Sequence, residues 1–183
     1  EGRLEEAKEA YEAAIAKDPR FARAYVNLGN IHRKLGENER ALQRYRQALV
    51  AEPGNFEAAN NFADLSAALG ENVALSIEYL NRALPEAGDK RAYGLDTLGW
   101  LQHLKGEEAE AEETLAQALA STDGSQRELR ATIWRHLAVV YNVSGRLHDA
   151  ARAEDLAAAC REGRAASEIP INSADQNRQN EGR

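Results

Sequence analysis

The chain is short of several kinds of residue, and each shortage excludes a class of protein. A single cysteine, Cys160, cannot form an internal disulfide or a zinc site built from cysteines. No stretch approaches the roughly 18 uninterrupted apolar residues of a membrane-spanning helix, so direct membrane insertion is not expected. Basic residues are in deficit, because 23 Lys and Arg face 30 Asp and Glu and give a net charge of -7. Binding to nucleic acid or to anionic membranes needs a basic surface, so neither is predicted.

Methionine is absent, and the sequence starts at Glu1. We therefore expect the native N-terminus to have been removed, together with any targeting signal. The composition alone leaves the cellular compartment open.

Proline and aromatic residues are also few, at four prolines and 6% aromatics, whereas hydrophobic residues make up 43% of the chain. Alanine supplies much of that hydrophobic share, and small side chains suit helices that pack closely. These values predict a folded, helical chain rather than a disordered one.

The strongest positive signal is an internal period of 34 residues. Gly2, Gly36 and Gly70 are spaced at this interval, and Gly106 and Gly145 continue the series at intervals of 36 and 39. The 34-residue interval also separates other pairs of like residues, namely Pro19 and Pro53, Ala7 and Ala41, Tyr11 and Tyr45, and Ala14 and Ala48.

A helical pattern with this period resembles the tetratricopeptide repeat (TPR), in which each unit is a pair of antiparallel helices. The best-matching unit is 22–55. In it, Gly29 and Ala41 are expected where the two helices cross most closely, and Tyr45 is expected to fill the space around that crossing. Gly36 would permit the tight turn between the helices.

The resemblance implies an all-α fold, a right-handed α-solenoid of about four and a half stacked helix pairs. The solenoid is predicted to span 1–163, divided into a half unit at 2–21 and units at about 22–55, 56–91, 92–125 and 126–163. Residues 164–183 are predicted to form a disordered polar tail. Its one apolar spot, Ile169–Ile171, either docks on a groove or has no role.

The predicted half unit has only one of the two helices of a repeat. The chain is expected to begin with the second helix of a unit, whose apolar face carries Leu4, Ala7, Tyr11 and Ile15. Without a first helix, part of that face would be uncovered. Either an upstream segment covers it, or a second subunit does, which would make the protein a homo-oligomer.

No catalytic, cofactor-binding or metal-binding motif is present in the sequence. None of the four histidines has a second histidine at helical metal-ligand spacing, and His32 is expected to have a packing role. The acidic run at 107–113 is interpreted as a solvated helix start, where carboxylates complement the helix dipole. Cys160, in a run of alanines, is expected to be a small buried residue. The sequence therefore predicts a protein that is not an enzyme and has no cofactor.

In stacked helix pairs the first helices line a concave surface, which is expected to hold a peptide or helix of a protein partner. Residues three, four and seven apart on each first helix give the candidate lining. Helix by helix, these residues are Arg23, Asn27, Asn30 and Arg33; Asn60, Asn61 and Asp64; Tyr93, Asp96, Trp100 and His103; and Arg135, His136 and Asn142.

Amides and aromatics dominate the binding roles expected in this lining. The side chains of Asn27 and Asn30 each offer a donor and an acceptor, which suits an extended peptide backbone. Tyr93 and Trp100 lie two helical turns apart on one face, as anchor residues would. Trp100 either contacts a ligand in this way or packs on a neighbouring helix, whereas Trp134 is expected in the core.

The charges in the lining bear on the kind of ligand. Some TPR proteins clamp a C-terminal carboxylate with Lys, Arg and Asn side chains. In this chain, Asp64 and Asp96 stand where such a clamp would need basic residues. A ligand of mixed charge with an apolar anchor is therefore expected instead.

The function predicted from these features is a non-catalytic protein-protein interaction scaffold. Self-assembly into an oligomer and service as a regulatory segment of a larger protein are the alternatives. The strings at 60–63 and 95–100 resemble bacterial members of the family, several of which act in envelope assembly, polysaccharide export or secretion. A bacterial cytoplasmic or periplasmic protein is expected on this ground.

Overall fold

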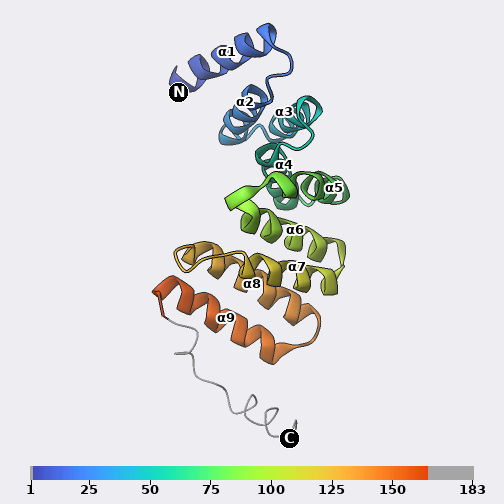
Figure 1. Ribbon diagram of the computed structural model, residues 1–183, viewed down its shortest axis with the longest axis vertical. Helices are drawn as coiled ribbons and strands as arrows, with labels where there is room; N and C mark the ends of the chain where they lie inside the picture. Colours follow the sequence, from blue (N-terminus) through green and yellow to red (C-terminus); the bar gives the residue numbers. More distant parts are fainter. Residues whose placement is uncertain (1, 165–183) are drawn as a thin grey trace, which may run out of the picture. The chain divides into compact units, whose positions relative to one another are not determined.

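The computed structural model describes residues 2–164 and contains only helices in that range, so the predicted all-α fold is confirmed (Figure 1). The α-helices are α1 (Gly2–Lys17), α2 (Ala22–Lys34), α3 (Asn38–Ala51), α4 (Phe56–Leu69), α5 (Val73–Ala83), α6 (Arg91–Lys105), α7 (Glu108–Ala120), α8 (Arg127–Val143) and α9 (Leu147–Glu162). Two short 3-10 helices, η1 (Leu84–Glu86) and η2 (Gly88–Lys90), lie between α5 and α6. Apart from Arg164, the predicted tail at 164–183 with its Ile169–Ile171 segment lies outside the described residues.

The chain divides into two compact units, Glu1–Ser121 and Thr122–Arg183. The first unit holds α1 to α7, and the described part of the second holds α8 and α9. Within the first unit, α2 packs on α3, α4 on α5 and α6 on α7, and α4 also lies along α6. In the second unit α8 packs on α9. Nowhere in 2–164 is a helix both long and apolar enough to cross a membrane.

The turn inside each helix pair explains the glycine period. Gly36 has a φ of +75°, a left-handed conformation that most side chains disfavour. This conformation lets the backbone N–H of Glu37 donate to the carbonyl of His32 at 2.9 Å, which satisfies one of the last carbonyls of α2. Equivalent backbone bonds close the turns at Gly70 and Gly106.

The two helices of a pair cross where one of them carries a glycine. A Cβ atom built on Gly29 would lie 2.5 Å from Cε1 of Tyr45, and one built on Gly99 would lie 2.6 Å from Cγ of Leu115. Tyr45 and Leu115 are fully buried. The close crossing predicted at Gly29 is therefore confirmed, and Gly99 repeats it in the last helix pair of the first unit.

A cluster of buried side chains joins the α2–α3 pair to the α4–α5 pair. Phe62 of α4 is almost fully buried, and the ring of Tyr79 meets it edge-on with centroids 5.2 Å apart. Burying a large side chain of this kind contributes about 1.5–3 kcal/mol. The other members of the cluster are Ala41, Leu42, Tyr45, Leu65 and Leu75.

The α4–α5 pair departs from regular geometry at two points. Helix α5 ends at Ala83, because Pro85 lacks a backbone N–H and cannot continue it. The turn between α4 and α5 contains one extra residue, and there Asn72 takes a φ of +53°. Asparagine tolerates this conformation better than most residues do.

Tyr45 also makes a polar contact inside the first unit. Its hydroxyl donates to Oδ1 of Asn30 on α2 at 2.8 Å. Burial raises the pKa of Tyr45 from 10.0 to about 12, because the phenolate would lose its hydration. The folded protein therefore holds this tyrosine in its neutral form.

The glycine crossing can be tested with Gly29→Ala. The added methyl group meets the Tyr45 ring, so we expect unfolding in urea to require about 1–3 kcal/mol less free energy. The matched control is Gly54→Ala in the same unit, whose Cβ would lie 3.6 Å from Cγ of Glu86, an ordinary contact. A Gly29→Ala protein as stable as the control would contradict the crossing.

The burial of Tyr45 predicts a loss of stability in alkali. Because the folded pKa lies above the ordinary one, this contribution is complete below pH 10 and disappears as the pH rises towards 12. We expect the free energy of unfolding to fall by about 1–2 kcal/mol over this range and the fall to be absent in Tyr45→Phe. Exposed Tyr93 provides the control, since Tyr93→Phe should keep the alkaline loss. Urea unfolding followed by circular dichroism measures all three proteins.

Candidate protein-binding face

The candidate site is a face of the first unit made by the solvent-facing sides of α2, α4 and α6. We call it the α2–α4–α6 face. The predicted lining residues on these helices are Arg23, Asn27, Asn30, Arg33, Asn60, Asn61, Asp64, Tyr93, Asp96, Trp100 and His103. The remaining three, Arg135, His136 and Asn142, lie on α8 in the second unit. The α2–α4–α6 face therefore consists of residues of the first unit alone.

Side-chain hydrogen bonds connect the three helices of the face. Nδ2 of Asn61 on α4 donates to Oδ1 of Asn30 on α2 at 2.9 Å. The hydroxyl of Thr97 on α6 lies 3.2 Å from Oδ1 of Asn60 on α4 and 3.1 Å from the backbone carbonyl of Tyr93. Part of the predicted amide set is thus used to hold neighbouring helices together.

An ion pair also spans α2 and α4. Nη2 of Arg33 lies 2.6 Å from Oδ2 of Asp64, and the two side chains are 39% and 52% exposed. Exposed pairs of this kind contribute about 0–1 kcal/mol, because water screens both charges. The pair neutralises Asp64 on the face without adding much to stability.

The aromatic residues of the face lie on α6. Tyr93 is 48% exposed, and Trp100 is half-buried. The Trp100 ring lies 4.9 Å from the ring of His103, one turn further along the same helix. Nδ1 of His103 in turn lies 2.8 Å from Oε2 of Glu108, which fixes the imidazole. Tyr93 is therefore exposed at the surface, whereas Trp100 packs partly against His103.

Asp96 differs from its predicted position. It is only 7% exposed, because it shares a buried stripe of α6 with Ala92, Leu95 and Gly99 at helical spacing. Its carboxylate is therefore not part of the exposed face. Thr97, which the sequence analysis did not select, lies on the face instead, between Tyr93 and Trp100. Thr97 follows Tyr93 by four residues and precedes Trp100 by three, and this helical spacing could have identified it as a residue of the face.

His32 has the packing role that the sequence predicts. His32 is buried, and its Nδ1 lies 2.6 Å from Oε2 of Glu37 in the turn after α2. This hydrogen bond is the main cause of a lowered pKa of Glu37. Within 2–164, no group of three or more His, Cys, Asp or Glu side chains is arranged to hold a metal ion.

Two family models match the N-terminal half of the chain. One is described as a TPR repeat and matches residues 1–36, and the other is described as a tetratricopeptide repeat and matches residues 26–92. Together they cover 92 of the 183 residues. A comparison with curated proteins finds no match.

Solved structures with the same fold cover most of the chain. A MamA crystal structure superposes with a TM-score of 0.74 at 19% identity, over 88% of this chain and 90% of that one. PilF of Pseudomonas aeruginosa gives 0.70 at 22% identity, over 86% and 68%. PilW, described as a widely conserved type IV pilus biogenesis factor, gives 0.73 at 22% identity, over 94% and 73%. At these identities the likeness shows a shared fold. The two repeat models show that the chain belongs to the tetratricopeptide repeat family.

Proposed function

We propose that this chain is a non-catalytic scaffold that binds a peptide or helical segment of another protein across the α2–α4–α6 face. Membership of the repeat family supports a protein-interaction scaffold in general. The proposal that the ligand binds across this face rests on an aromatic pair, Tyr93 and Trp100, beside amide groups with unused hydrogen-bonding capacity.

The amide groups of α2 suit a peptide backbone. Oδ1 of Asn30 already accepts from the Tyr45 hydroxyl and from Asn61, so the Nδ2 donors of Asn30 are left for a ligand. The half-buried Asn27, one turn earlier, makes no side-chain hydrogen bond to any described residue. Each amide could therefore bond to a peptide group of an extended ligand without breaking an existing bond.

The aromatic pair supplies apolar anchoring. Tyr and Trp are enriched among the residues that dominate binding energy, because they bury large areas with few rotatable bonds. Trp100 packs on the ring of His103, so its contact area is partly preformed, and Tyr93 adds a ring that is about half exposed. Preformed contacts lower the entropy that a ligand must overcome on binding.

The charges of the face suit a ligand that carries both signs. Arg23 is exposed on α2, while the cation of Arg33 is paired with Asp64. Since the exposed pair is weak, a ligand with its own charges could replace either member at small cost. With Asp96 buried, the face is less acidic than the sequence predicts.

A peptide library displayed on phage tests this proposal. We expect wild-type protein to select peptides that contain an apolar residue, and their affinity to fall about thirtyfold or more when Tyr93 and Trp100 are both replaced by alanine. Val50→Ala is the matched control, because Val50 is 86% exposed on α3 and lies outside the face. The single variant Tyr93→Ala, at an exposed position, guards against an effect of misfolding.

Two results would contradict binding at the α2–α4–α6 face. Selected peptides that bind the double variant as tightly as the wild type would place the binding surface elsewhere on the chain. Failure to select any peptide, together with sedimentation of the protein as an oligomer, would favour the alternative of self-assembly.

The ion pair of the face generates a separate prediction about stability. Arg33→Gln and Asp64→Asn should each change the free energy of unfolding by less than about 1 kcal/mol, because both side chains are exposed. The double variant should show a coupling energy of similar size, measured by urea unfolding. A coupling energy of several kcal/mol would mean that the ion pair stabilises the packing of α2 on α4, so that a ligand could not readily replace either member.

A further inference from the structure

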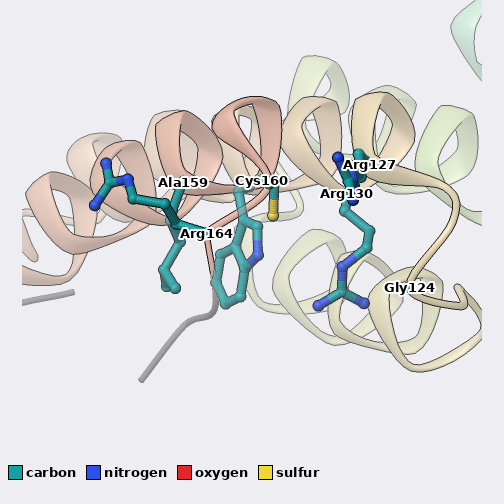
Figure 2. Close-up of a pocket in the computed structure, with 9 residues that line it drawn as sticks. Gly124, Arg127, Arg130, Ala159, Cys160 and Arg164 are labelled. Carbon is teal, nitrogen blue, oxygen red and sulfur yellow. The ribbon is translucent and has the colours of Figure 1, made fainter. Parts of the chain in front are cut away.

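The second unit contains a pocket that plays no part in the proposed function. It has a volume of about 510 Å³ and lies between α8 and α9. Figure 2 shows Arg127 and Arg130 on one side of the Cys160 thiol and Arg164 on the other. Trp134 and Leu156 add apolar surface to the lining.

The arrangement follows from helical spacing on α8. Arg127, Arg130 and Trp134 are three and four residues apart, so they share one face of the helix. The sequence analysis placed Trp134 in the core and Cys160 among buried residues. Both are instead half-buried and line the pocket, because in 122–164 no described element covers this side of the α8–α9 pair.

The charge of the pocket is opposite to that of the chain. The described residues that line it include three arginines and no acidic residue, although the whole chain has a net charge of -7. Nη1 of Arg130 donates to the neutral hydroxyl of Thr122 at 2.7 Å. Within 2–164 neither Arg127 nor Arg130 is paired with a carboxylate, whereas Arg164 is paired with Glu162. Two guanidinium groups therefore keep charge available for a ligand.

The side chain of Arg127 lies beside the C-terminal end of α9. A Cβ atom on Gly163 would lie 2.7 Å from Nη1 of Arg127, so the guanidinium lies close to the glycine that follows α9. The last carbonyls of a helix carry partial negative charge, which favours a cation there. The end of α9 therefore favours the charge of Arg127, which no carboxylate of the described residues neutralises.

We propose that this pocket is a second binding site, for a protein segment that presents a carboxylate next to a large apolar side chain. Guanidinium groups bind carboxylates through paired hydrogen bonds, and Arg127 and Arg130 supply these donors. The apolar side chain would pack on Trp134 and Leu156. An anion without an apolar part, such as inorganic phosphate, would use only half of the lining.

Tryptophan side-chain N–H signals in an NMR spectrum of the full chain test the proposal directly. The chain has two tryptophans, and Trp100 lies on the α2–α4–α6 face whereas Trp134 lies in this pocket. The probe is a capped pentapeptide of alternating glutamate and leucine. We expect it to shift the Trp134 signal saturably, so that failure of this site and failure of the first are told apart by which tryptophan responds.

Matched variants and peptides sharpen the result. Arg127→Gln or Arg130→Gln should weaken peptide binding about tenfold, since each removes a charge-assisted hydrogen bond. Arg161→Gln removes the same charge from an exposed position of α9 that does not line the pocket, and should leave the affinity unchanged. Replacing the leucines of the probe by alanine should also weaken binding.

Several outcomes would overturn the proposal. These are equal binding of a glutamine–leucine peptide, equal weakening by Arg161→Gln, and phosphate binding as tight as that of the peptide, which would indicate a simple anion site. The proposal would also fail if the wild-type Trp134 signal did not respond to the peptide and yet moved in the variant Glu168→Gln without any peptide. This result would identify the chain's own following segment as the occupant.

Discussion

The close crossing of the two helices within a pair is the constraint on which the first unit depends. At Gly29 and Gly99 one helix carries no side chain, and the other brings Tyr45 or Leu115 within contact distance of its backbone. This approach fixes which side of α2 and α6 is turned inward. It also explains how a chain with few aromatic residues forms a core, because closely packed alanines and single large side chains fill the space.

Once the crossings are fixed, the polar side chains of the first helices divide into two groups. Asn61 and Thr97 hold neighbouring helices together, and Asn30 does so through its oxygen while its nitrogen stays available. Asn27 makes no side-chain hydrogen bond to a described residue, and Tyr93 presents an exposed ring. A surface whose geometry is set by the first group before binding can use the second group for recognition, which is the physical basis of the proposed scaffold function.

The two units differ in the chemistry that they offer. The face of the first unit combines amides, aromatics and an exposed ion pair, which suits a ligand of mixed charge. The pocket of the second unit combines guanidinium groups with apolar surface, which suits a carboxylate beside an apolar side chain. Each site is complete within its own unit, so each can be tested by itself.

The fold followed from the sequence because its signals are local. The turn at Gly36 needs a left-handed residue, the end of α5 needs only Pro85, and a 34-residue period reports the length of a helix pair. The exposure of individual side chains was decided by the tertiary structure. Asp96 looked like a lining residue but lies in the buried stripe of α6, and Trp134 looked like core but lines a pocket. Such outcomes depend on which neighbouring helix covers a given side of a helix, and a pattern along one chain does not contain that information.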